Sequence, residues 1–118
     1  MNAKVVKIGI ASEEELRQRT LDIAAGRRRR ARGEPKIWFT SLRSAAEVLS
    51  EKNRDLLRIL AEQQPASVKE LAELANREPG NLSRTLKTLA GYGLVEIERE
   101  GRRMRPVARA TRFQIYAH

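Results

Sequence analysis

Residues 77–87 bring together side chains that are suited to reading a nucleic acid. Six positions in this segment are of interest: Arg77, Gly80, Asn81, Ser83, Arg84 and Lys87. Arginine can pair bidentately with guanine and asparagine with adenine, while serine and lysine bind phosphates or base edges. A glycine near a helix N-terminus lets a phosphate approach the backbone closely. We interpret this segment as a candidate recognition element for duplex DNA. The alternative is an ordinary solvated helix face.

A second group of basic side chains surrounds the dipeptide Glu100-Gly101, where we expect the chain to turn. Its members are Arg99, Arg102, Arg103 and Arg105. A basic hairpin loop of this kind can reach the minor groove or the flanking phosphates of DNA. The alternative interpretation is a charged strand edge that protects the protein against aggregation.

A run of arginines forms the third group: Arg27, Arg28, Arg29, Arg30 and Arg32. Three interpretations are open for it, namely a DNA-binding arm, a contact for an acidic partner protein or RNA, and a solvated connector. The formal net charge is +9; residues 27–36 and 99–118 each have a net charge of +5, whereas residues 37–98 have a net charge of −1. A polyanion would therefore be held mainly by the two basic segments.

Groups suited to catalysis or metal binding are scarce in the sequence. The one histidine is His118, the aspartates are Asp22 and Asp55, and there is no cysteine. No nucleophile–base pair, metal-ligand spacing or Gly-rich phosphate loop can be found. We therefore expect a protein that is not an enzyme and needs no cofactor or metal. The lack of cysteine suits a reducing cytoplasm, and no stretch is long enough to span a bilayer, so we expect a cytoplasmic protein without a membrane partner.

The spacing of apolar residues predicts the elements that position these groups. Helices are expected from about Ser41 to Leu49, Ser50 to Gln64, Ser67 to Ala75 and Pro79 to Gly91. In the last of these, Leu82, Leu86 and Leu89 share the inner face. Residues 94–98 and 102–107 alternate as the strands of a hairpin, and residues 112–116 form a last strand. Ahead of them, residues 4–10 form a strand, Ser12 caps a helix, and residues 36–39 are extended.

The order of helix, short helix, turn, helix and hairpin predicts a winged helix-turn-helix. The expected fold class is thus mainly α with a small β-hairpin wing (α+β), with an N-terminal strand–helix extension and a C-terminal strand. We divide the chain into residues 1–36, an extension and basic linker for dimerisation or partner contact, and residues 37–118, the DNA-binding domain.

Four segments carry a resemblance to a known family. They are Leu56-Leu57-Arg58-Ile59-Leu60, Ser67-Val68-Lys69-Glu70-Leu71-Ala72, Asn81-Leu82-Ser83-Arg84-Thr85-Leu86-Lys87-Thr88-Leu89 and Gly93-Leu94-Val95-Glu96. Over about residues 37–116 the chain resembles the MarR-like winged-helix regulators, and within them a small subgroup of predicted regulators in which a β segment and a helix precede the domain. The resemblance implies a dimeric, autoregulating repressor, and members of the subgroup are often proposed as antitoxins. The chain lacks the long terminal dimerisation helices of full-length MarR proteins, which argues against their small-molecule effector pocket.

Three functions follow as hypotheses. The first is a sequence-specific repressor that binds double-stranded DNA as a homodimer, with strands around Val5–Ile10 and Phe113–Tyr116 supplying the dimer contact by edge pairing. The second is an antitoxin whose first forty residues neutralise a protein toxin, an activity that deletion of residues 1–36 should separate from DNA binding. The third is a winged-helix protein that binds RNA.

Overall fold

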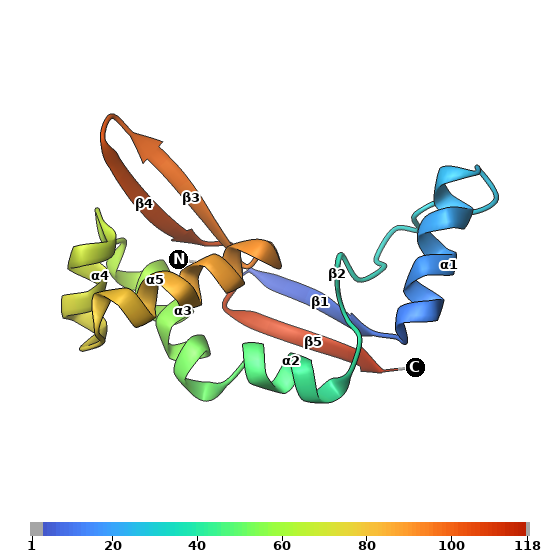
Figure 1. The fold of residues 1–118 in the computed structure, drawn as a ribbon, viewed down its shortest axis with the longest axis horizontal. Helices are drawn as coiled ribbons and strands as arrows, with labels where there is room; N and C mark the ends of the chain where they lie inside the picture. The colour runs from blue at the N-terminus through green and yellow to red at the C-terminus, as the bar shows by residue number, and fades with distance from the viewer. Residues whose placement is uncertain (1–3, 118) are drawn as a thin grey trace.

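The computed structural model describes residues 4–117 and has an α+β architecture. Within these residues, five helices and five strands follow one another in the order β1 (Val5–Ile10), α1 (Glu13–Ala24), β2 (Ile37–Phe39), α2 (Leu42–Val48), α3 (Glu51–Gln63), α4 (Val68–Ala75), α5 (Pro79–Gly91), β3 (Val95–Glu100), β4 (Arg103–Ala108) and β5 (Arg112–Ala117) (Figure 1). The α+β class expected from the sequence is confirmed. His118 lies outside the described residues.

Local sequence signals explain where the helices begin. Ser12 caps α1 in a complete capping box with Glu15, as expected. The hydroxyls of Ser41, Ser50 and Ser67 cap α2, α3 and α4 by accepting a hydrogen bond from the backbone N–H three residues on. Each cap satisfies an N–H group that has no partner inside its own helix.

The strands form two separate sheets. A three-stranded sheet has the order β2-β1-β5, and β1 pairs parallel with both neighbours. Ile8 lies opposite Ile37 on one side and Ile115 on the other. The second sheet is the antiparallel β3–β4 hairpin, which rises from the end of α5 (Figure 1).

The central position of β1 joins the front of the chain to the rest of the fold. The hydrophobic core extends across the domain boundary expected between residues 36 and 37, because Ile8 and Ile10 of β1 are buried in one cluster with Ile37 and Phe39. The expectation that β1 offers an edge for dimerisation is wrong, since both edges of β1 are already hydrogen-bonded within the chain. A chain that began at residue 37 would lose the middle strand of this sheet.

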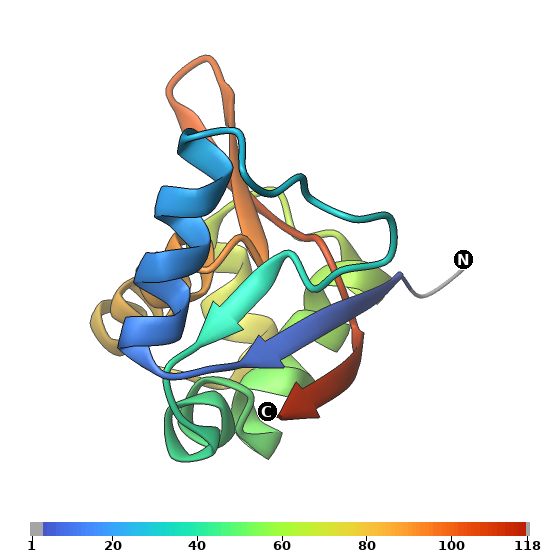
Figure 2. The same ribbon diagram turned by 90° about the vertical axis from the view of Figure 1, so that its right-hand side faces the viewer.

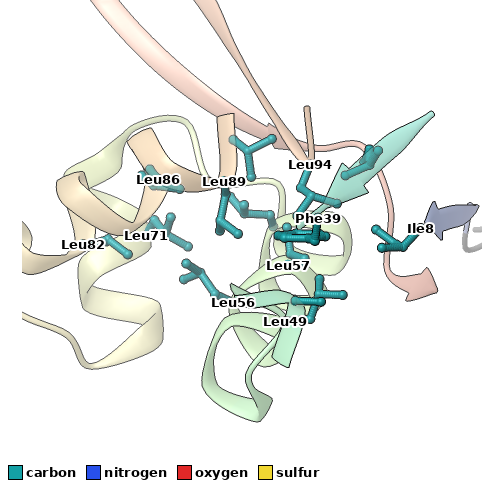
Figure 3. Close-up of a cluster of buried hydrophobic side chains, with 14 of the residues drawn as sticks. Ile8, Phe39, Leu49, Leu56, Leu57, Leu71, Leu82, Leu86, Leu89 and Leu94 are labelled. Atoms are coloured by element: carbon teal, nitrogen blue, oxygen red, sulfur yellow. The ribbon is translucent and has the colours of Figure 1, made fainter. Parts of the chain in front are cut away.

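The helices after β2 pack around a leucine-rich core. Its members include Leu49, Leu56, Leu57, Leu60, Leu71, Leu82, Leu86, Leu89 and Leu94. Figure 3 shows how the labelled leucines of α3, α4 and α5 converge with Leu49 after α2 and Leu94 before the hairpin. Burying one such side chain stabilises the fold by about 1.5–3 kcal/mol. The ring of Phe39 stacks on Tyr92, with 4.4 Å between ring centroids, and thereby links β2 to the end of α5.

Helix α1 stands apart from this core. None of its residues is buried, and it lies at the opposite end of the molecule from α4 (Figures 1 and 2). Arg19 of α1 forms a cation–π contact with Trp38 of β2, in which the guanidinium carbon lies 5.1 Å from the ring centroid. The indole in turn covers Gly9 of β1, where even a Cβ atom would collide with the ring. Among residues 4–117, no helix has the length and apolar character needed to cross a membrane.

Candidate functional site

The site begins at the sharp turn between α4 and α5. Asn76 ends α4 in the left-handed conformation, with φ of 52°, and Glu78 caps α5 two residues later. Pro79 occupies the first turn of α5, where the missing N–H costs nothing. The short connection fixes α5 against α4, so the direction of the outer face of α5 is set by the buried leucines on its inner face.

The outer face of α5 carries the polar side chains that the sequence singled out. Leu82, Leu86 and Leu89 are buried, whereas Gly80, Asn81, Ser83, Arg84 and Lys87 are all exposed. Among residues 4–117, the side chains of Asn81, Ser83, Arg84 and Lys87 have no hydrogen bond or ion pair within the protein. Their donors and acceptors are therefore free to bind a ligand.

Arg77 does not belong to this free set. Its side chain is half-buried, and Nη2 donates a hydrogen bond of 3.2 Å to the hydroxyl of Thr85. Thr85 also donates to the carbonyl of Asn81, one turn earlier in α5. Arg77 thus contacts α5 through a hydrogen bond, unlike the exposed side chains above, and its expected role as a DNA contact stays a prediction.

The N-terminus of α5 is already occupied by a carboxylate. Glu78 accepts hydrogen bonds of 2.8 Å from the backbone N–H groups of both Gly80 and Asn81. These two hydrogen bonds hold the pKa of the Glu78 carboxyl below its usual value. The expectation that a phosphate binds at this helix end, helped by Gly80, is therefore corrected: Glu78 fills the place that the phosphate would take.

The hairpin places its side chains on two faces with different charge. The loop has two residues, with Gly101 at positive φ (62°) in its first position, as a tight hairpin requires. On one face, Val95, Ile97 and Pro106 pack toward the helices. Arg99 and Met104, which lie opposite each other, continue this face toward the tip of the hairpin, where both side chains are exposed. On the other face, glutamates and arginines lie opposite one another.

This second face places a glutamate opposite two of the four arginines expected to contact DNA. Glu98 lies opposite Arg105, and Glu100 lies opposite Arg103. Arg105 is only half-exposed, and its Nη1 also lies 3.7 Å from a carboxylate oxygen of Glu100. Arg99, Arg102 and Arg103 are all exposed and have no ion pair among the described residues. Of these three, only Arg103 has a glutamate opposite it in the hairpin register.

The arginine run lies in the loop between α1 and β2, which ion pairs hold at both ends. Arg27 binds the carboxylate of Asp22 at 3.0 Å. At the other end, the carboxylate of Glu34 binds both Arg28, at 2.8 Å, and Arg19, at 2.7 Å. The two arginines lower the pKa of Glu34 from its usual value of 4.5 to about 2.

Three arginines of this loop remain exposed: Arg29, Arg30 and Arg32 have no hydrogen bond or ion pair in the part of the chain that the structure describes. Both ribbon views place the loop and the hairpin tip on the same side of the molecule, and Figure 1 places them at opposite ends of its long axis (Figures 1 and 2). The loop is thus a second basic surface, separate from α5.

A family model matches residues 48–115, from the end of α2 to β5, which is more than half of the chain. The chain belongs to the HVO_A0114 family. The part that the HVO_A0114 model covers contains α5 and the hairpin, and leaves β1, α1, the arginine loop and β2 outside it. No curated protein matches the chain.

Sequence reasoning missed two features of this HVO_A0114 member. The first is the pair of glutamates that lie opposite Arg103 and Arg105, although the alternation Val95-Glu96-Ile97-Glu98-Arg99-Glu100 already contained the signal. Once the loop is two residues long, the register follows and the charges face each other. The second is the cap at Glu78, which stands directly before a helix-starting proline and is a less common capping residue than Ser or Asp.

Proposed function

We propose that this HVO_A0114 protein is a winged helix-turn-helix regulator that binds double-stranded DNA in a sequence-specific manner, in the way the MarR-like proteins it resembles are expected to act. Helix α5 is the recognition helix and the β3–β4 hairpin is the wing. One observation carries the proposal. In the part of the chain that the structure describes, the exposed face of α5 holds four polar side chains without partners, and the adjacent hairpin ends in three exposed arginines without an ion pair, Arg99, Arg102 and Arg103.

The two parts of this surface have different tasks. Asn81 and Arg84 lie on the outer face of α5 and are of the types that pair bidentately with adenine and guanine, so they select the sequence. Arg99 and Arg102 bind the sugar–phosphate backbone, which adds affinity for any duplex. Because the helical body has a net charge of −1, this backbone contact supplies most of the attraction. The activity is one of binding, as expected of a repressor, and it uses no catalytic group.

The test is a selection of bound sequences from a pool of randomised duplexes. The parent protein is expected to enrich one motif, and Arg84→Ala is expected to bind with a relaxed preference, losing about 1–3 kcal/mol of discrimination at one base pair. Arg43→Ala is the matched control, because Arg43 is equally exposed but lies on α2. No enrichment by the parent, or the same loss for both variants, would contradict the proposal. Preference for structured RNA over duplex at physiological salt would favour the RNA-binding alternative.

A second candidate, the antitoxin, is favoured by helix α1. This helix buries no residue, and Leu21 on it is 49% exposed. A helix held only at one side has apolar surface left for a partner protein. Deletion of residues 1–36 is no test of this idea, because it removes β1 from the core.

The sharper test changes α1 alone. Leu21→Asp and the parent are each co-expressed with the product of the neighbouring open reading frame. If that product is toxic and the parent neutralises it, Leu21→Asp is expected to lose the neutralisation and to keep DNA binding. If both chains neutralise equally, α1 is not the contact.

A further inference from the structure

Strand β5 forms one open edge of the parallel sheet. It pairs with β1 along its whole length, from Arg112 opposite Val5 to Ala117 opposite Ile10, and no strand formed by residues 4–117 pairs with its other side. Five of its six residues are exposed, including Ile115 at 47% and Tyr116 at 46%. Parallel sheets are usually covered on both faces, and a long open edge attracts another strand.

The backbone groups that face this open edge can be identified from the pairing with β1. The N–H of Arg112 donates to the carbonyl of Lys4, at 3.3 Å, so Arg112 faces β1. Successive residues of a strand direct their N–H and C=O groups to opposite sides, and therefore Gln114 and Tyr116 also face β1. The N–H and C=O groups of Phe113 and Ile115 face the open edge, where they need partners.

An apolar groove runs beside this edge, between β5 and α2. Its volume is about 510 Å³, and its lining includes Leu42, Leu49, Phe113 and Ile115, together with the polar residues Arg54, Thr111 and Arg112. Leu42 at the start of α2 is 58% exposed. Water contacts this apolar surface in the free chain, and covering it would be favourable by about 25 cal/mol per Å².

The residues of β5 are complementary to themselves when the strand is reversed. If two copies run antiparallel with Gln114 opposite Gln114, then Phe113 of each lies opposite Ile115 of the other. In the same register, Arg112 of each lies opposite Tyr116 of the other. The first pair is apolar and lies on the groove face, and the second can form a cation–π contact on the outer face. The two Arg112 side chains, which repel each other, end up at opposite ends of the new pairing.

We propose that β5 is the dimer interface of this protein, and that it pairs antiparallel with β5 of a second copy about a two-fold axis at Gln114. Phe113 and Ile115 exchange backbone hydrogen bonds across the axis, and the two sheets join into one of six strands. The same residues contact in both directions, as a two-fold interface requires. The proposal does not rest on DNA binding, although it would supply a repressor with two copies of α5.

A cysteine crosslink tests both the interface and its register. The chain contains no cysteine, so Gln114→Cys introduces a single thiol. Opposite residues in a pair without mutual hydrogen bonds have Cα atoms about 4.5 Å apart, which fits a disulfide. Mild oxidation is expected to convert Gln114→Cys into a covalent dimer. Tyr116→Cys is the matched control and should stay uncrosslinked, because position 116 faces position 112 of the other copy.

Sedimentation equilibrium measures the association itself, without DNA. The parent is expected to be a dimer, and Ile115→Lys should weaken the association at least tenfold, because it places two charges in the joined sheet. Leu74→Lys, at a site 44% exposed on α4, should leave the association unchanged. Circular dichroism of each variant checks that it is folded. A parent that stays monomeric, a dimer that Ile115→Lys leaves intact, or efficient crosslinking of Tyr116→Cys with none of Gln114→Cys would overturn the proposal.

Discussion

Glu100 and Arg103 lie directly opposite each other at the end of the β3–β4 hairpin, while the carboxylate of Glu100 lies 3.7 Å from Nη1 of Arg105. Arg105 lies directly opposite Glu98 in the same way, and its side chain is only half-exposed. Arg99 and Arg102 have no such partner among residues 4–117. The four arginines of the hairpin are therefore two pairs with different electrostatic surroundings.

This difference predicts unequal effects on DNA affinity. Arg99→Ala and Arg102→Ala should each reduce the slope of log affinity against log salt by about one, because each removes an unpaired phosphate contact. Arg103→Ala should change the slope by less, since Glu100 lies opposite Arg103 in the hairpin and offsets part of its positive charge. Titrations of one duplex at several salt concentrations measure the slopes. Equal slopes for the Arg99, Arg102 and Arg103 variants would show that the cross-strand glutamates have no influence.

The cap at Glu78 leads to a prediction that separates stability from binding. Glu78→Ala should lower the free energy of unfolding, because the N–H groups of Gly80 and Asn81 lose their acceptor. Glu78→Ser restores an acceptor without the negative charge, and should unfold close to the parent. Both variants should bind DNA more tightly than the parent, since a carboxylate beside the phosphates is gone. Urea denaturation and DNA titration are the measurements, and weaker DNA binding by Glu78→Ser would count against α5 as the recognition helix.

The pair of arginines on Glu34 predicts a pH dependence of stability. The pKa of the Glu34 carboxyl is about 2 in the folded protein and near 4.5 when its partners are absent. A carboxyl whose pKa is lowered by folding stabilises the fold fully above pH 4.5 and loses this contribution as the pH falls toward 2. The melting temperature of Glu34→Gln should therefore lie below that of the parent at pH 7, and the gap should narrow below pH 4.5. Glu47→Gln, at an exposed position on α2 with no ion pair in the described part of the chain, is the control and should show no such trend.

The contact between Gly9 and Trp38 predicts a coupled pair of substitutions. Gly9→Ala should destabilise the protein by about 1–3 kcal/mol, because the new methyl group must displace the indole ring. In the background of Trp38→Leu, which removes the ring, the same change should cost much less. The difference between the two costs, measured in a double-mutant cycle by denaturant unfolding, gives the coupling energy. Additive effects would mean that the indole moves aside without cost.

Much of the helical part of the fold could be predicted because its signals are local. Serine caps, the proline at the start of α5 and the spacing of Leu82, Leu86 and Leu89 are read within a few residues of the chain. The helix starts at Ser41, Ser50, Ser67 and Pro79 are confirmed, as are the hairpin and the last strand to within two residues. For the same reason, the exposed face of α5 was correctly placed.

The sequence by itself thus determined the helices, the hairpin and the set of polar side chains that face outward on α5. Only the tertiary structure decided that β1 lies between β2 and β5, because parallel strands pair across more than a hundred residues of chain and leave no local signal. It also decided that Arg77 is bound to Thr85 and that Glu78 fills the end of α5. The first contact joins residues eight positions apart, on the turn and on α5, whereas the second is local and was missed because glutamate is a less common capping residue.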